Sequence, residues 1–145
     1  MSQVPALIAI LLGGFAIAAQ APLNGALGRT LGAALPAATV SFGVGFVLLL
    51  GLSYATVGNP FGRLGAVPVW QWAGGILGAY YVWSVIWGVP SLGVVTAMAA
   101  LILGQMTGAL ILDALGAFGV PVQSISPTRI LAVVLVAAGV VLSRL

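Results

Sequence analysis

The residues that could carry chemistry are few in this chain of 145 residues. It has four arginines and one acidic side chain, Asp113, and it contains no lysine, histidine or cysteine. Without cysteine or histidine there are no disulfides, thiol nucleophiles or imidazole bases, and the usual zinc and haem ligands are missing. A single carboxylate also leaves no pair for acid–base catalysis. We therefore expect no enzyme activity, no bound metal and no cofactor.

Three amides lie inside long apolar segments. Gln20 and Asn24 flank Pro22 at a spacing of four residues, so in a helix they share a face beside a residue that frees a backbone carbonyl. Gln105 lies near the middle of another apolar segment. Polar groups inside a membrane are costly and face a cavity or a neighbouring helix. Cavity lining is the favoured interpretation for Gln20 and Asn24, and for Gln105 the two alternatives stay equal.

Aromatic side chains recur at helical spacing in a third segment. Tyr80, Trp83 and Trp87 are three and four residues apart and share a stripe with Ser84, whereas Tyr81 points elsewhere. Such a stripe either packs against lipid and neighbouring helices or forms the wall of a substrate pocket. A pocket wall of this kind would suit organic cations or flat apolar solutes.

Asp113 is the only acidic side chain that could take up a proton or bind a cation, and it is the only coupling candidate if the chain moves solutes. An ionisable group in a membrane segment is a functional hypothesis by default, but Asp113 falls in the last turn of its segment, where the helix dipole disfavours a negative charge. The alternatives are a pair with an arginine such as Arg129, or contact with water. No other carboxylate is present, so we favour a facilitator driven by the gradient of its substrate.

The composition requires lipid as the solvent. The chain is 62% hydrophobic and 3% charged, with a mean hydropathy of +1.28, whereas soluble domains carry about 25% charged residues. The isoelectric point of 10.3 reflects the scarcity of acids. Nucleic-acid-binding proteins cluster their basic residues, and these arginines are scattered, so we expect the lipid bilayer and no nucleic acid as a partner.

Five segments are long and apolar enough for a helix that crosses a bilayer, which needs about 20 such residues. We therefore expect an all-α, multi-pass membrane protein with one transmembrane domain over residues 1–145. A tight turn at residues 89–91 separates the third and fourth segments, and the first is retained as a helix. The expected helices cover about residues 4–28, 36–57, 69–88, 92–115 and 128–142.

Five spans distribute the arginines evenly between the two sides of the membrane. Arg63 and Arg129 fall on one side, and Arg29 and Arg144 fall on the other. Orientation follows the Lys/Arg bias of short loops, and here there is none. One orientation could still win through hydrophobicity, but the balance favours dual topology. Copies paired antiparallel would form a ten-helix dimer with inverted repeats, a common transporter plan.

Glycines at a spacing of four residues predict close helix packing. The clearest pairs are Gly74 with Gly78 and Gly104 with Gly108. Small residues let helix backbones approach closely in lipid, where no hydrophobic effect drives their association. The spacing predicts tight packing without identifying the partner helix.

Several short strings together resemble the YdcZ-like family of bacterial inner-membrane proteins, which belongs to the drug/metabolite transporter superfamily. The strings are QAPLNGAL (20–27), SFGVG (41–45), GGILGAYYV (74–82), GQ (104–105) and DALGAFG (113–119). The resemblance covers nearly the whole chain. It implies a half-transporter of five helices, found as dual-topology proteins, oppositely oriented pairs or fused ten-helix chains. The membrane glutamate of the more distant small multidrug-resistance proteins has no counterpart here.

Residues and resemblance together predict a small inner-membrane transporter that acts as a dimer. Its partner would be a second copy or an oppositely oriented paralogue. It would move a small organic solute by export or facilitated diffusion. The alternatives are a small dual-topology channel and a structural membrane subunit of a larger complex.

Overall fold

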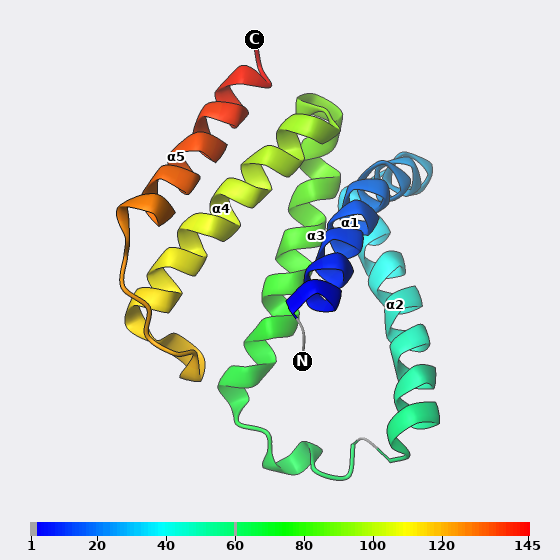
Figure 1. Ribbon diagram of the computed structural model, residues 1–145. Coiled ribbons are helices and arrows are strands. Elements are labelled where there is room, and N and C mark those ends of the chain that lie inside the picture. Colours follow the sequence, from blue (N-terminus) through cyan, green and yellow to red (C-terminus); the bar gives the residue numbers. More distant parts are fainter. Residues whose placement is uncertain (1–2, 60) are drawn as a thin grey trace. The chain divides into compact units, whose positions relative to one another are not determined.

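The computed structural model describes residues 3–59 and 61–145, and every regular element in this part of the chain is helical (Figure 1). The all-α prediction is confirmed. The expectation of one domain over residues 1–145 includes residues 1, 2 and 60, which lie outside the described part. The five α-helices are α1 (Gln3–Leu31), α2 (Ala34–Val57), α3 (Ala73–Leu92), α4 (Val94–Leu115) and α5 (Pro127–Leu142). Short 3₁₀ turns cover Leu64–Ala66, Val69–Trp72 and Ala117–Gly119.

Four of the five predicted spans have the length and composition to cross a membrane. They are α1, α2, α4, and α3 together with the 3₁₀ turn before it. The fifth helix, α5, has 16 residues and is therefore roughly 24 Å long, which is less than the roughly 30 Å of a bilayer core.

The predicted turn at residues 89–91 is wrong. Helix α3 continues through Pro90 to Leu92. The break comes at Gly93, where φ is 77°, a conformation that costs glycine little and other residues more. A proline removes one backbone hydrogen bond, and in lipid the remaining backbone groups still have to be paired within the helix. The helix therefore continues past the proline.

Two further boundaries differ from the prediction. Helix α1 extends to Leu31 and carries Arg29 in its last turn, where a cation suits the dipole. Helix α3 begins at Ala73, because the four preceding residues form a 3₁₀ turn.

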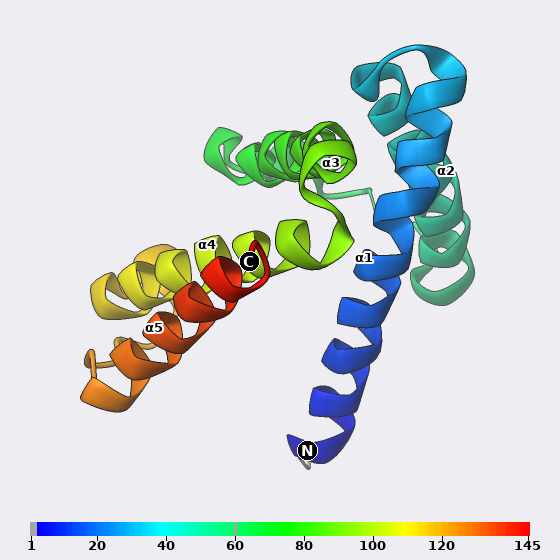
Figure 2. The ribbon, with the colours of Figure 1, turned by 90° about the horizontal axis from the view of Figure 1, so that it is seen from above.

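The chain divides into two compact units, of which one ends at Pro90 and the other begins at Ser91. In the first unit α1 packs along α2 (Figure 2). Helix α3 joins them through side chains, with Val82 and Ile86 buried against Ala37 and Ala38 of α2. Gly28 of α1 belongs to the same contact, because a Cβ there would lie 3.3 Å from Cγ2 of Ile86.

The second unit is a hairpin of α4 and α5, which lie side by side (Figure 2). Gly116 ends α4 in the left-handed conformation, with φ at 60°. The chain then returns so closely that a Cβ on Gly116 would lie 2.6 Å from Cγ2 of Val122. The backbone N–H of Gln123 donates to the carbonyl oxygen of Asp113 at 2.9 Å. This turn sets the first residues of α5 beside the last turn of α4.

Candidate functional site

Two of the predicted site residues, Gln20 and Asn24, lie one turn apart on α1, which runs unbroken through Pro22. The side chain of Asn24 is 7% exposed, yet it makes no hydrogen bond with any residue that the structure describes. Its amide atoms are not fully enclosed, because Nη1 of Arg129 is the buried side-chain nitrogen or oxygen without a partner among the described residues. Asn24 is therefore available to a ligand or to water rather than used to hold helices together.

A small cavity lies beside this amide. Gln20, Asn24 and Tyr81 of α3 contribute to its wall, and its volume is about 10 Å³, which is close to the room that one water molecule needs. Polar atoms from two helices therefore converge on a space in which a water or a ligand atom could complete their hydrogen bonds.

A larger cleft adjoins the same two side chains, Gln20 and Tyr81. Its volume is about 430 Å³, which is within the range of small-molecule sites. Helix α2 supplies one wall with Ser41, Phe42 and Phe46. The polar groups in the lining are an amide, an aliphatic hydroxyl and a phenol. No carboxylate or arginine lines the cleft, so its chemistry suits a neutral solute with hydrogen-bonding groups and a flat or apolar body.

Some hydroxyls of the first unit are bonded within their own helix and others are not. Those of Thr30, Thr39 and Thr56 each donate to the carbonyl oxygen four residues earlier, which is the usual solution for a hydroxyl in a membrane helix. The hydroxyls of Ser41 and Tyr81 make no hydrogen bond with described residues, and both line the cleft. The hydroxyls of Ser53, Tyr54 and Tyr80 also make no hydrogen bond with described residues and lie outside the cleft. What distinguishes Ser41 and Tyr81 is that they face the cleft together with Gln20.

The predicted aromatic stripe exists but lies elsewhere on α3. The ring centroids of Tyr80 and Trp83 are 5.9 Å apart, and those of Trp83 and Trp87 are 6.1 Å apart. Tyr80 and Trp87 are exposed, whereas Trp83 packs partly against the buried core. The tyrosine in the cleft is Tyr81, which the sequence analysis set apart from the stripe. The stripe is not part of this cleft, and its substrate role stays a prediction.

Sequence reasoning also missed Ser41 and Phe42. Most residues around α2 are apolar or small, so no amphipathic pattern marks the side that faces α1 and α3. A usable signal was present, because Ser41 interrupts an apolar segment as Gln20 does in α1. Any polar residue within an apolar membrane helix is therefore a candidate lining residue.

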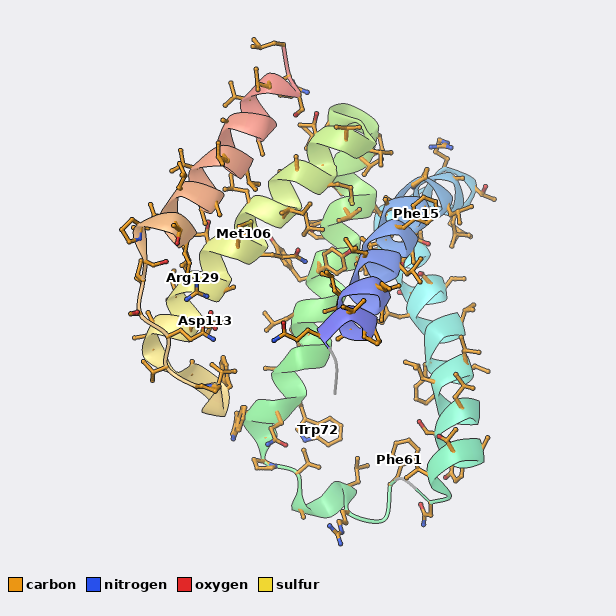
Figure 3. All side chains as sticks on the ribbon, in the orientation of Figure 1. Phe15, Phe61, Trp72, Met106, Asp113 and Arg129 are labelled. Carbon is orange, nitrogen blue, oxygen red and sulfur yellow. The ribbon has the colours of Figure 1, made fainter. Side chains whose placement is uncertain are left out.

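The remaining polar candidates lie in the hairpin. Gln105 is exposed on α4, and its substrate role stays a prediction. The carboxylate of Asp113 accepts a hydrogen bond from the guanidinium of Arg129 on α5 (Figure 3). This ion pair is one of the two alternatives that the sequence analysis gave for Asp113. Nη1 of Arg129 is buried without a hydrogen-bond partner. The coupling role of Asp113 stays a prediction, although its charge is already paired.

Of the four predicted packing glycines, only Gly78 has a neighbour within its unit. A Cβ on Gly78 would lie 3.7 Å from Cζ of Phe42, one of the residues that line the cleft. A Cβ on Gly74, Gly104 or Gly108 would have no atom within 4 Å. These three glycines present bare backbone that a second chain or lipid can approach.

Comparison with known proteins agrees with the membrane character of these helices. The family model described as "Putative inner membrane exporter, YdcZ" matches residues 5–142. The chain is 29% identical over 127 residues to the inner membrane protein YdcZ of Escherichia coli (strain K12), an alignment that covers 86% of this chain and 85% of that protein. No solved structure matches the chain. The chain therefore belongs to the YdcZ family and is a multi-pass inner membrane protein.

Proposed function

We propose that this protein is a half-transporter that moves a small, uncharged organic solute across the inner membrane through the cleft of its first unit. The observation that carries this proposal is the set of uncommitted polar groups on Gln20, Asn24, Ser41 and Tyr81. Polar groups in a membrane segment are stable when they face a partner or a wet cavity. A purely structural subunit would instead hydrogen-bond these groups to one another.

The lining of the cleft supports the class of solute. A permanent cation is best held by a carboxylate, and the only one in the chain, Asp113, is paired with Arg129. The phenol and amide can donate to and accept from a neutral ligand, while Phe42 and Phe46 offer ring faces to its apolar part. The family description as an exporter supports movement outward, and the single paired carboxylate supports a facilitator rather than a proton-driven pump.

We further propose that two copies act together in antiparallel orientation. In the hairpin unit the only described residues below one-tenth exposure are Thr96 and Ala97, so this unit has almost no core of its own. Gly104 and Gly108 leave open backbone on α4, which favours close contact with another helix. If α5 completes a fifth span despite its 16 residues, the arginines divide evenly and support opposite orientations. An oppositely oriented paralogue would meet the same requirements as a second copy.

The transport proposal is tested on purified protein in two steps. Neutral aromatic and polar solutes are first screened for stabilisation against thermal unfolding, because a ligand bound to the native state raises its stability. Flux of a stabilising solute is then measured in reconstituted vesicles for wild type, Tyr81→Phe and the control Thr39→Val. We expect Tyr81→Phe to lower flux about tenfold through loss of one ligand hydrogen bond, and Thr39→Val to leave it unchanged. Wild-type vesicles no more permeable than empty ones would refute transport, and a continuous ion current would indicate a channel.

The antiparallel arrangement is tested with reporters fused to the C-terminus that are active on one side of the membrane only. Dual topology predicts a signal from both compartments, and removing one arginine from one side should shift the ratio of the two signals because loop charge sets orientation. The variants Arg144→Gln and Arg63→Gln are matched, since they remove the same charge from opposite sides. A signal from one compartment in wild type and both variants would eliminate the homodimer and leave the oppositely oriented paralogue.

A further inference from the structure

A second hollow lies in the first unit and shares no lining residue with the cleft. This recess has a volume of about 360 Å³ and lies between the last turns of α1, the first turn of α2 and the end of α3. Ile86 contributes to its wall, and Val82, one turn earlier on α3, contributes to the wall of the cleft. The buried core of Ala37, Ala38, Val82 and Ile86 thus stands between the two hollows.

Arg29 is the charged residue of this recess. Its side chain folds back along α1, and Nη1 lies 3.8 Å from the position that a Cβ on Gly25 would take. This distance is an ordinary van der Waals contact and places the guanidinium beside its own helix. The guanidinium is held next to the recess rather than extended away from α1.

The charge of Arg29 has no acidic side chain to pair with. The sequence contains one such group, Asp113, and Arg129 already engages it. A guanidinium offers five N–H donors in a planar fork that matches a carboxylate or a phosphate. Since an uncompensated charge near lipid is costly, an anion from outside the chain is the partner that would complete this group.

The other walls suit the same kind of ligand. Ala33 and Ala34 line the recess, and the start of α2 has no side-chain cap, so its first N–H groups offset the negative end of the α1 dipole there. Trp87 also lines the recess and is 70% exposed, which suits a site at the membrane interface, where indole rings gather. An anionic head joined to an apolar body would use both the guanidinium and the ring.

We propose that this recess binds an anionic group, a phosphate or a carboxylate, through Arg29, with Trp87 against the apolar part of the same molecule. The anionic group has two possible sources, a phospholipid headgroup or a free anionic solute. The site is separate from the neutral cleft, and its occupation does not depend on the transport proposal. Binding, not flux, is therefore the quantity to measure.

The test uses the full-length protein in a neutral detergent with four probes: phosphatidylglycerol, phosphatidylcholine, inorganic phosphate and benzoate. Thermal unfolding and native mass spectrometry report binding to wild type, Arg29→Gln, and Arg63→Gln, which removes the same charge from a loop outside the recess. We expect at least one anionic probe to bind wild type more tightly than phosphatidylcholine does. Arg29→Gln should weaken that binding about tenfold or more, and Arg63→Gln should leave it unchanged.

The probes distinguish the two sources. Stabilisation by phosphatidylglycerol alone assigns the recess to a lipid headgroup, and stabilisation by phosphate or benzoate assigns it to a free anion. If Arg29→Gln and Arg63→Gln weakened binding equally, the effect would depend on net charge alone and the proposal would be overturned. Equal binding of all four probes would overturn it as well. If Arg29→Gln fails to fold, Trp87→Ala, at an exposed position, replaces it. That variant should weaken binding about threefold, and unchanged binding would also overturn the proposal.

Discussion

The two units of this protein differ in the polar side chains that connect their helices. In the hairpin of α4 and α5 the polar groups are paired at both ends, with Asp113 bound to Arg129 at one end. At the other end the Ser143 hydroxyl lies 3.1 Å from that of Thr96 and donates to the carbonyl oxygen of Val140 at 2.7 Å. In the unit of α1, α2 and α3, Asn24 is 7% exposed and its amide makes no hydrogen bond with described residues.

This difference separates a structural role from a binding role. The hairpin has almost no buried apolar side chains to hold its helices together, so hydrogen bonds at both ends hold α5 against α4. The first unit has an apolar core of its own, formed by Val82, Ile86 and the alanines of α2, and it does not need its amides for packing. Polar groups that packing does not need, and that face a cleft, are available to a ligand.

The largest stability effect should follow from breaking the ion pair of the hairpin. The Asp113 and Arg129 side chains are 26% and 32% exposed, so the pair is partly desolvated. We expect Arg129→Leu to lower the free energy of unfolding in detergent by about 1–3 kcal/mol, because it leaves the carboxylate without its charged partner.

A double-mutant cycle sharpens this prediction. Asp113→Leu combined with Arg129→Leu should recover most of the loss, since two apolar groups leave no uncompensated charge. Additive losses in the double variant would show that the two residues do not act as a pair. Flux through Asp113→Asn addresses coupling separately: a pairing role predicts lower stability with transport retained, whereas a coupling role predicts lost transport with stability retained.

Sequence length and hydropathy were sufficient to predict the helices, because few other structures satisfy the backbone in lipid. They were also sufficient to suggest the partner of Asp113, because Arg129 follows the short loop after α4. The face of each helix was harder to predict. Tyr80 and Tyr81 are adjacent and chemically identical, and in a helix that is apolar all round no hydrophobic pattern decides which of them faces the protein interior.

Helix ends in this chain depend on backbone conformation more than on residue type. Pro90 is a strong breaker in sequence terms, yet α3 ends two residues later, at Leu92, just before the glycine with positive φ. Ile86 approaches Gly28 closely, but Gly28 belongs to neither predicted glycine pair. The sequence analysis therefore did not identify it as a packing position. Such contacts arise from the way helices pack together, which residue spacing within one helix does not record.

The smallest stability effect is expected at Asn24, and measuring it tests the central claim most directly. Leucine at this position removes an amide that has no partner, so the free energy of unfolding should change by less than about 1 kcal/mol. Solute-dependent stabilisation and flux should both be lost, while Thr39→Val keeps both. If Asn24→Leu were markedly less stable and still transported the solute at the wild-type rate, Asn24 would be a packing residue and the account of the first unit as the binding unit would be wrong.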